Sequence, residues 1–554
     1  DSKDSKLSDS NTTTGAPFRG MGKEELLQHS GKPFWRRLRM ICISIVLIGW
    51  LALIITVVAL VLIYPRCKTP EGRDWWQRDV IYRVYVRSFK DSNNDGIGDL
   101  KGLTSKLDYI KDLGVGAISL SAIYTDDGTD GDFHIMDHKS IDSNVGTIAD
   151  FRNLLSDAHA KGLKVILDYI PNHTSDNHQW FIESRDAIMR NDTHRNYYVW
   201  TDYPTNWRSV DDSTAWNRSS PRDQYYLHQF RSDLPDLNLR SSQVQQELEG
   251  ILKHWLNEGV DGFYVRDSGF LFEDYDMRDE SLTSSNLPQD EYNSYNHEYT
   301  YGLPEVMDML SRWRHVMNNY TNRVLLADIN GDVSKMMELY GYFKQDGVDL
   351  SLNRMFRDNN YPCDGACVRQ YVNQWMTNLP TSRWANWVVD DDSSARIASR
   401  FNESFVKAFY MVTMLLPGTP FIYYGDEIGM KDVPAQTPDA GSMLSYIKNL
   451  TKLRQQDSFV IGEYHSFTVD NQIVSFVREF DGKKGYLVAV NFGTSSATRD
   501  FTAGHSTIEK TATVEFSTGS AAGFEMEADV DTSELSLPPN QGVVVSWDYV
   551  AKEL

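Results

Sequence analysis

Residues 150–171, DFRNLLSDAHAKGLKVILDYIP, contain the repeating unit that decides the fold of this chain. Residues 150–162 form an amphipathic, helix-like segment, and residues 164–171 form a short apolar run with β-branched residues. Strands that alternate with helices are typical of parallel sheets, because two parallel strands need a long crossover connection. The stretch therefore predicts one helix–strand unit of an α/β fold.

The same alternation continues in both directions along the chain. Candidate strands lie at residues 80–89, 115–124, 164–171, 262–267, 323–329, 347–352, 386–389 and 420–427, and a second helix-like segment lies at 244–259. Eight such units over about 350 residues predict a (β/α)8 TIM barrel, whose site lies at the carboxyl ends of the strands. The polar stretch at about 175–240 predicts an inserted subdomain, and the strand pattern over 456–554 predicts a closing antiparallel β-sandwich domain.

Residues 41–63, ICISIVLIGWLALIITVVALVLI, contain no charged side chain. A helix of this length spans about 34 Å, which matches a hydrocarbon core of about 30 Å. A buried core helix would show a polar stripe, and a signal peptide has a shorter apolar region with a cleavage site. The segment predicts a single transmembrane helix between a tail (1–40) and a neck (64–74). One helix cannot enclose a transport pathway, so any transport requires a partner.

The flanks of this segment predict its orientation. Four basic residues lie in 32–39, against three basic and two acidic residues in 66–74, which favours a cytoplasmic N-terminus. Glycosylation sequons at Asn191, Asn217, Asn319, Asn402 and Asn449 follow the segment, as expected of an extracellular domain. We therefore expect a single-pass, type II membrane protein with an extracellular ectodomain at 75–554.

Composition excludes several classes of protein. The net charge of −22 argues against a nucleic-acid partner, which requires clustered Lys and Arg. A hydrophobic content of 41% excludes wholesale disorder, and 4 cysteines exclude a disulfide scaffold. Cys42 lies in the apolar segment, and Cys363 and Cys367 could pair locally. Cys67 remains, either as a free or palmitoylated thiol or as one half of an intermolecular disulfide.

Five motifs of the ectodomain occur in the order found in one enzyme family. They are DSNNDGIGDLKGL (91–103), DYIPNHTSDNHQWF (168–181), PDLNLRSSQV (235–244), GVDGF (259–263) and LPGTPFIYYGDEIGM (416–430). Together they resemble the α-amylase family of glycoside hydrolases, over nearly all of residues 75–550. The resemblance implies that the barrel occupies 75–455 and carries the insertion at about 175–240.

The N-terminal part resembles a different class of protein. KEELL (23–27), the single apolar segment, and Cys67 before the Trp75–Trp76 pair are similar to the heavy-chain subunits of heteromeric amino-acid transporters, of the cell-surface antigen type. In that family a type II anchor carries an amylase-like ectodomain. The resemblance implies a plasma-membrane protein that binds, stabilises and traffics a multi-span transporter light chain. It also implies that Cys67 forms the disulfide to that light chain.

Retaining glycosidases require a carboxylate nucleophile and a carboxylic acid about 5–5.5 Å apart. The family pattern places Arg266 at the nucleophile, Asp328 at the acid/base and Ser393 at the third carboxylate. A guanidinium cannot attack an anomeric carbon, and Asp is one methylene shorter than the family's Glu. These positions predict that the ectodomain has no glycosidase activity and is not an enzyme.

The alternative is a membrane-anchored α-glucosidase that uses Asp267. This residue follows Arg266 directly, and a shift of one position on a strand turns the side chain to the opposite face. A local bulge would return Asp267 to the site. We therefore expect Asp267 to face away from the mouth unless the strand is irregular there.

The loop after the first strand predicts a metal site. Asp91, Asn93, Asp95 and Asp99 offer side-chain oxygens at alternating positions, and Ile97 can offer its carbonyl oxygen. Oxygen ligands at this spacing suit Ca²⁺, and the oligosaccharide-cleaving members of the α-amylase family use this loop for calcium. A solvated Asp/Asn/Gly turn is the alternative. We expect a structural Ca²⁺ ion here.

Overall fold

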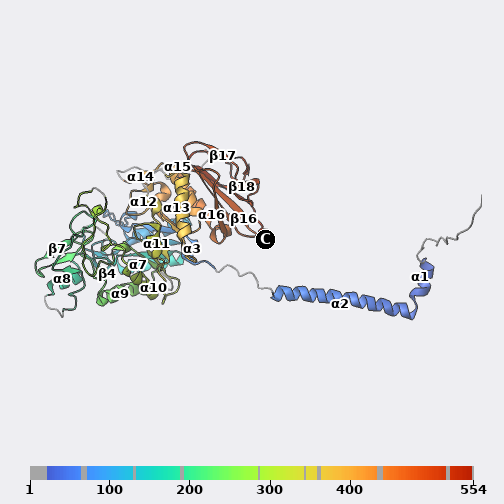
Figure 1. The fold of residues 1–554 in the computed structure, drawn as a ribbon, viewed down its shortest axis with the longest axis horizontal. Helices are drawn as coiled ribbons and strands as arrows, with labels where there is room; N and C mark the ends of the chain where they lie inside the picture. Colours follow the sequence, from blue (N-terminus) through green and yellow to red (C-terminus); the bar gives the residue numbers. More distant parts are fainter. Residues whose placement is uncertain are drawn as a thin grey trace, which may run out of the picture. The chain divides into compact units, whose positions relative to one another are not determined.

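The computed structural model describes residues 22–63, 72–128, 133–187, 192–284, 287–341, 345–358, 363–432, 441–518 and 524–551 (Figure 1). Two of the residues singled out above, Cys67 and Asn191, lie outside these ranges. The chain divides into two units, Asp1–Gly72 and Arg73–Leu554, and each is described by itself.

The first unit contains the apolar helix. A short helix α1 (Lys23–Ser30) precedes α2 (Pro33–Ile63), which runs for 31 residues without a break. Within the span Pro33–Val57, an 18-residue window has a mean hydropathy of 2.8 and no buried residue, and within the described ranges α2 is the one helix long and apolar enough to cross a membrane. The prediction of a single apolar helix is confirmed. The helix begins eight residues before the predicted segment, because Pro fits the first helical turn and Arg and Leu favour helices.

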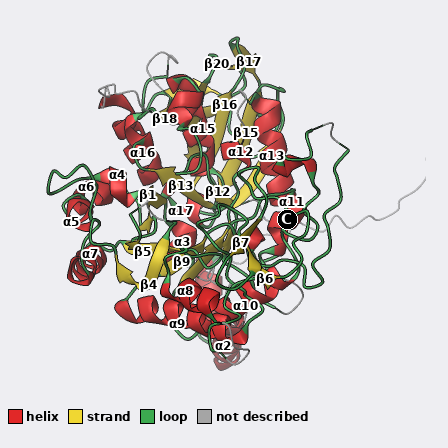
Figure 2. Cartoon of the chain, turned by 90° about the vertical axis from the view of Figure 1, so that its left-hand side faces the viewer, coloured by secondary structure: helices red, strands yellow, loops and turns green. Residues whose placement is uncertain are grey.

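Eight parallel strands form the central sheet of the second unit (Figure 2). They are β1 (Ile81–Val84), β2 (Ala117–Leu120), β5 (Lys164–Tyr169), β9 (Gly262–Val265), β10 (Val324–Ala327), β11 (Leu350–Ser351), β12 (Asn386–Trp387) and β13 (Thr419–Tyr423). Their order is β11-β10-β9-β5-β2-β1-β13-β12. Each lies within one of the eight predicted strand regions or overlaps it, so the TIM-barrel prediction is confirmed.

The two outer strands of this order are joined by the side chain of Asn386 and, just beyond the strand ends, by a backbone hydrogen bond from Val388 N–H to Asn353 O at 3.1 Å. Asn386 Nδ2 of β12 donates to Ser351 O of β11 at 2.6 Å, and the backbone N–H of Asn353 donates to Asn386 Oδ1 at 2.8 Å. Asn386 is fully buried. Its amide therefore supplies the hydrogen bonds that β11 and β12 lack, and it closes the barrel.

Helices cover the outside of the barrel (Figure 2). They are α4 (Val86–Phe89), α5 (Leu100–Thr104), α6 (Leu107–Asp112), α7 (Ile148–Ala160), α9 (Ser242–Glu258), α10 (Glu305–Met317), α11 (Val333–Glu338), α12 (Met355–Asp358), α13 (Gly365–Asn378), α14 (Ile397–Arg400), α15 (Glu403–Leu415), α16 (Gly441–Arg454) and α17 (Asp457–Val460). A capping box of Thr147 and Asp150 starts α7, and Gly259 ends α9 in a left-handed conformation with φ 109°. These signals place α7 and α9 within two residues of the predicted helices.

Between β5 and α9 the chain forms a small subdomain. It contains α8 (Gln179–Asp186) and a three-stranded antiparallel sheet of β6 (Trp200–Thr201), β8 (Gln224–Leu227) and β7 (Trp216–Ser219). Its core is aromatic: the rings of Trp207 and Trp216 stack with centroids 5.5 Å apart. A separate hairpin, β3 (Tyr124–Asp126) and β4 (Ile135–Ile141), follows β2.

The C-terminal part is an antiparallel β-domain. Its six-stranded sheet has the order β14 (Glu463–Phe467), β15 (Ile473–Glu479), β16 (Lys484–Asn491), β21 (Gln541–Asp548), β18 (Thr511–Ser517), β19 (Asp529–Asp531), and β17 (Ala497–Arg499) pairs with β20 (Leu535–Leu537). Val474 and Phe476 of β15 pack into the barrel's core, whereas Ile473 and Val477 pack into the core of the β-domain itself. Both faces of this strand are thus buried, which is why it reads as a nearly continuous apolar run.

Two tryptophans close the end of the barrel at which the strands begin. Trp75 and Trp76 of the short helix α3 (Trp75–Arg78) are buried in one cluster with the inward side chains of the strands. Trp75 Nε1 donates to Asn322 O, which precedes β10, and Thr419 Oγ1 at the start of β13 donates to Trp76 O at 2.6 Å. We call Trp75, Trp76 and this cluster the barrel floor. The opposite end, where the strands finish, is the mouth.

Candidate functional site

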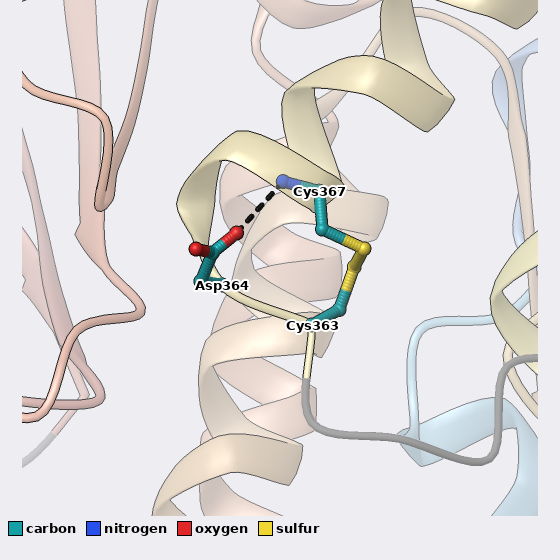
Figure 3. Close-up of a disulfide and its surroundings, with 3 residues drawn as sticks. All are labelled: Cys363, Asp364 and Cys367. Carbon is teal, nitrogen blue, oxygen red and sulfur yellow. Dashed lines mark hydrogen bonds between the residues drawn. A yellow bond between two sulfur atoms is a disulfide. The ribbon is translucent and has the colours of Figure 1, made fainter.

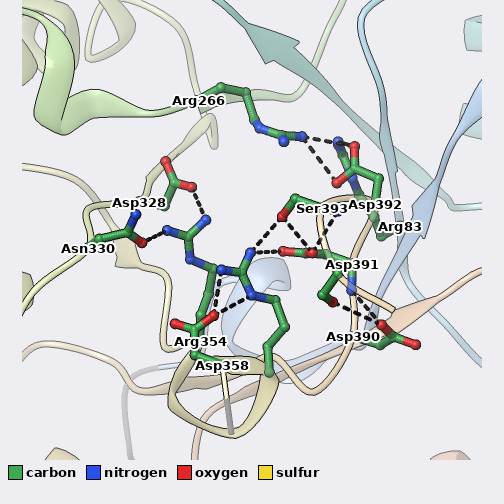
Figure 4. Close-up of polar contacts among 12 residues, drawn as sticks. Arg83, Arg266, Asp328, Asn330, Arg354, Asp358, Asp390, Asp391, Asp392 and Ser393 are labelled. Carbon is green, nitrogen blue, oxygen red and sulfur yellow. Dashed lines mark hydrogen bonds and ion pairs between the residues drawn. The ribbon is translucent and has the colours of Figure 1, made fainter. Parts of the chain in front are cut away.

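Four charged side chains fill the mouth of the barrel (Figure 4 shows three of them labelled). Arg83 lies on β1, Asp168 on β5, Arg266 directly after β9, and Asp392 in the segment after β12. Arg83 Nη2 donates to Asp168 Oδ2 at 2.7 Å and to Asp392 Oδ2 at 2.8 Å. Arg266 Nη1 donates to Asp168 Oδ2 at 3.1 Å and to Asp392 Oδ2 at 3.0 Å. We call these four residues the charge cluster.

The charge cluster neutralises itself within a buried environment. Its four side chains are between 3% and 9% exposed, so an unpaired charge there would be costly. Burial raises the pKa of Asp392, but the guanidinium groups of Arg266 and Arg83 outweigh burial and hold this pKa well below its usual range. The ring of Tyr264 lies 5.2 Å from the Arg266 guanidinium, and that of Phe133 lies 5.9 Å from it. A cation thus occupies the position at which the family's nucleophile is expected.

Asp328, the predicted acid/base position, is engaged by three donors of the protein. Tyr264 Oη donates to Oδ2 at 2.8 Å, Arg354 Nη1 donates to the same oxygen, and the backbone N–H of Asp267 donates to Oδ1 at 2.7 Å. Asp328 is fully buried at the end of β10, and Arg354 also donates to Asn330 Oδ1. Both carboxylate oxygens are therefore used inside the protein.

Asp267 departs from the strand geometry expected for it. β9 ends at Val265, and Asp267 adopts a left-handed conformation with φ 51° before a 3₁₀ turn (Ser268–Phe270). The alternation of side chains on a strand therefore does not apply to Asp267, and the chain has at this point the irregularity that the α-glucosidase alternative requires. Burial and the neighbouring Asp328 carboxylate raise the pKa of Asp267 to about 6.

Ser393 lies in a third polar group at the rim of the mouth (Figure 4). Its backbone N–H and its Oγ each donate to Asp391 Oδ1 at 2.9 Å. Arg357 Nη1 donates to Asp391 Oδ2 at 2.6 Å and to Ser393 Oγ at 2.7 Å. The three residues thus form one closed network.

The arrangement at the mouth favours structure over sugar hydrolysis. A retaining mechanism needs a free carboxylate near the anomeric carbon, and Arg266 occupies that place with its charge already balanced. Asp168 of the 168–181 motif is part of the same balance, while Asn172 donates to Asp236 at 3.3 Å. His173 is buried, and burial lowers its pKa to about 3. The charged side chains of the charge cluster are thus paired with one another.

Three arginines of the mouth escaped the sequence analysis: Arg83, Arg354 and Arg357. One signal could have identified Arg83, which is a charged residue inside the apolar run of β1. A charge at a buried strand position requires a partner, so Arg83 predicts an acidic residue nearby. Arg354 lies directly before α12 and Arg357 lies within it, and no sequence pattern there marks either residue as buried.

The loop predicted to bind Ca²⁺ folds as a series of turns. Asp91 Oδ1 accepts the backbone N–H of Asn93 at 3.0 Å, and Asp95 Oδ1 accepts that of Ile97 at 2.8 Å. Asp99 caps α5 and accepts the N–H of Ser92 at 2.9 Å. The oxygen donors suit a hard cation, and Asp91 and Asp95 keep lone pairs beyond those used in the turns, whereas both carboxylate oxygens of Asp99 already accept two hydrogen bonds each, from Ser92 and Gly102. The loop therefore matches Ca²⁺ in the chemical type of its ligand atoms.

The described cysteines fall into two environments, a disulfide and a free thiol. Cys363 and Cys367 form a disulfide with Cα atoms 5.3 Å apart, and Asp364 between them accepts the N–H of Cys367 and caps α13 (Figure 3). Cys42 is a free thiol in α2. Cys67 lies outside the described residues.

Of the five asparagines predicted to carry glycans, the four that the structure describes are all exposed. Asn402 is the N-cap of α15, and its Oδ1 accepts the N–H of Phe405 at 2.9 Å, which leaves the amide nitrogen for a glycan. Asn217 Nδ2 donates to Tyr226 Oη at 3.0 Å, and Asn319 Nδ2 donates to backbone carbonyls of α10. Asn449 lies on α16.

Comparisons with known proteins divide the chain as the motifs do. The family described as "Alpha amylase, catalytic domain" matches residues 83–475, and the one described as "Solute carrier family 3 member 2 N-terminus" matches residues 4–82. Amino acid transporter heavy chain SLC3A1 of Rattus norvegicus is 32% identical over 96% of this chain and 86% of its own length. The Homo sapiens protein of that name is 33% identical over 82% of this chain and 70% of its own length.

Enzymes are similar to the barrel as well. Maltase 1 of Drosophila virilis is 37% identical over 65% of this chain and 59% of its own length. Among solved structures, an alpha-glucosyl transfer enzyme superposes with a TM-score of 0.74 and 27% identity, covering 86% of this chain and 100% of the enzyme's. The barrel fold is therefore shared by sugar-processing enzymes and transporter subunits, and its function must be read from the mouth.

Proposed function

This chain, which combines a single apolar helix with an α-amylase-type barrel, belongs to the amino acid transporter heavy chains, and we propose that it escorts a multi-span amino-acid transporter light chain. In this role it binds the light chain, stabilises it and carries it to the plasma membrane. The observation that carries the proposal is the charge cluster, in which a buried cation stands in place of a nucleophile. A barrel without a nucleophile can still serve as a large, folded extracellular domain that binds the light chain.

The membrane part of the proposal rests on α2 and Cys67. We propose that the N-terminus is cytoplasmic, that the barrel is extracellular, and that Cys67 forms a disulfide with the light chain. A single helix offers no polar pathway across a bilayer, so it contributes packing and anchoring while the partner conducts the substrate. The predicted neck (64–74) places the thiol close to the membrane surface, within reach of a membrane-embedded partner.

Non-reducing electrophoresis of the full chain expressed with its cell's own light chains tests the tether. We expect a heavy covalent band from the wild type that disappears in Cys67→Ser. The matched control is Cys42→Ser, which removes the free thiol of α2 and should leave the band unchanged. A band that persists in Cys67→Ser would contradict the tether, and identification of the attached chain by mass spectrometry would name the partner.

One observation favours a second function, α-glucosidase activity. Asp267 does approach Asp328, so the mouth holds two neighbouring carboxyl groups. Assay of the detergent-solubilised full chain on maltose and a nitrophenyl glucoside separates the two functions. We expect no turnover above a buffer blank. Turnover that is abolished in Asp267→Asn and retained in Asp500→Asn, an exposed aspartate of the β-domain, would establish the enzyme instead.

We also propose that a structural Ca²⁺ ion is bound by Asp91, Asn93, Asp95, Asp99 and the carbonyl oxygen of Ile97. The ion would tie the loop after β1 to the start of α5, which Asp99 caps. We expect Ca²⁺ to raise the Tm of EDTA-treated wild type but not of Asp95→Asn. Asp500→Asn is the matched control, because Asp500 accepts the N–H of Thr502 in a similar turn at 2.9 Å. An equal response in both variants would contradict the site.

A further inference from the structure

Three potential metal ligands meet on the C-terminal β-domain, outside the mouth of the barrel. His465 lies on β14, Glu479 ends β15, and His505 lies in the segment after β17. One ligand atom from each lies within 4.8 Å of the others, and no other group of three His, Cys, Asp or Glu side chains does so in the described ranges of the chain. No motif in the sequence marks this group, because its members come from three separate segments.

The strand register brings the first two together. β14 and β15 are antiparallel, with Glu463 opposite Glu479 and His465 opposite Val477. His465 and Glu479 are therefore diagonal neighbours on one face of the sheet. The imidazole of His505 stacks on that of His465, with ring centroids 4.8 Å apart and planes at 28°. The two rings thus approach the Glu479 carboxylate from the strand and from the following segment.

The hydrogen bonds of this group leave one polar atom unsatisfied. Thr507 Oγ1 donates to Glu479 Oε1, which fixes the carboxylate, and Glu479 is 2% exposed. His505 Nε2 lies 3.5 Å from Glu479 Oε2, is buried, and makes no hydrogen bond to any described residue. A buried nitrogen that makes no hydrogen bond destabilises the folded state, and a cation bound between it and the Glu479 carboxylate would remove that cost. Thr507 occupies the supporting position that orients a carboxylate ligand in metal sites.

We propose that His465, Glu479 and His505 bind one Zn²⁺ ion. Two imidazole nitrogens and one carboxylate oxygen are a common ligand set for this ion, and imidazole selects Zn²⁺ over Ca²⁺ or Mg²⁺. A tetrahedral site has a fourth position, which water or the exposed Glu463 fills; Glu463 Oε2 already lies 3.2 Å from His465 Nε2. Ligand atoms on such a tetrahedron are about 3.4 Å apart, so partly exposed His465 closes the site by a small rotation.

The ion would act as a clamp. β14 is an edge strand of the six-stranded sheet, paired only with β15 among the described strands. The segment that carries His505 and Thr507 is hydrogen-bonded through its backbone to Thr532 at both ends, and it contacts the edge strand through side chains such as the ring of His505 against that of Phe467. Zn²⁺ would join the edge strand to that segment and would shield the strand's outer surface from further pairing.

Zinc retention by the full chain in detergent tests the proposal. The protein is stripped with EDTA, dialysed against micromolar ZnCl₂ and analysed for metal by mass spectrometry. We expect one equivalent in the wild type, none in His465→Ala or His505→Ala, and one in His315→Ala, which removes an exposed histidine on α10. Because His465 is partly exposed, His465→Ala should fold, and circular dichroism verifies this.

A second variant tests the geometry rather than the ligands. Thr507→Val removes the hydroxyl that orients Glu479, and we expect about tenfold weaker zinc binding with unchanged stoichiometry at saturation. Zinc content that is equal in the wild type and His465→Ala, or absent from the wild type, would overturn the proposal and leave a histidine stack paired with a carboxylate.

Discussion

The two ends of the barrel are closed by opposite kinds of chemistry. At the floor, Trp75 and Trp76 fill the space between the strand ends with apolar surface. At the mouth, the charge cluster fills the equivalent space with two cations and two anions. The floor is an ordinary core that any barrel needs, whereas paired charges cost more desolvation than apolar residues of the same volume. The mouth thus keeps charged side chains where a polar site is expected, but the two arginines and two aspartates of the charge cluster neutralise one another.

The largest expected effect comes from unbalancing the charge cluster. Arg266→Met leaves Asp168 and Asp392 to share Arg83, and we expect about 3–5 kcal/mol less stability at pH 7.5 in chemical denaturation. The loss should shrink towards pH 4, because a protonated Asp392 no longer needs the cation. The double variant Arg266→Met/Asp392→Asn restores the balance and should recover most of the loss. Equal losses in the single and double variants would mean that packing, not charge, holds the mouth.

The matching change at the floor is Trp76→Ala. Removal of a buried indole should cost about 3 kcal/mol through lost burial and the remaining cavity. Since no ionisable group is removed, the loss measured by denaturation should be the same at pH 5 and pH 7.5. A loss at the floor that varied with pH as strongly as that of Arg266→Met would erase the distinction between the two ends.

Asp267→Asn should stabilise the protein. The folded-state pKa of about 6 lies above the ordinary value of 3.8, so the folded chain holds a proton that the unfolded chain releases. The stability contributed by Asp267 therefore falls as pH rises from about 4 to 6 and stays lower above that range. We expect Asp267→Asn to gain about 2 kcal/mol at pH 7.5 and almost nothing at pH 4. A gain that is independent of pH would contradict the raised pKa.

The smallest expected effect is at the rim. Arg357→Lys keeps the charge opposite Asp391 but loses the guanidinium fork that also reaches Ser393, and should cost about 1 kcal/mol. Thermal unfolding measures this against Arg383→Lys, a change in an exposed ion pair with Asp346 that should cost almost nothing. Equal effects would show that the rim network is no tighter than a surface pair.

The fold could be predicted closely because each barrel strand is a short apolar run whose position is set by burial. The runs at 164–171 and 262–267 became β5 and β9 with their starts unchanged. The helices α7 and α9 were equally readable, since a capping box and a left-handed Gly259 mark their ends. Local physics and the fold agree in these elements.

The site was readable only in part. Arg266 could be placed by counting along a strand, but Asp267 could not, because the chain leaves strand geometry there and φ becomes positive. Partners that come from distant segments, such as Arg83 with Asp392, depend on tertiary packing that no local pattern records. The same holds for His465, Glu479 and His505, which meet only after the β-domain has folded.

The barrel floor also decides how a force applied at Arg73 would enter the second unit of the chain. Arg73, the first residue of this unit, places its guanidinium 4.5 Å over the ring of Trp384. The helix α3 follows directly, and its two tryptophans are buried at the starts of the barrel strands. A pull from the neck is thereby shared among the starts of β10 and β13 through Asn322 and Thr419, rather than peeling one strand from an edge. The chain therefore enters the barrel through a buried helical turn that is attached to several strands, and not through a single exposed strand.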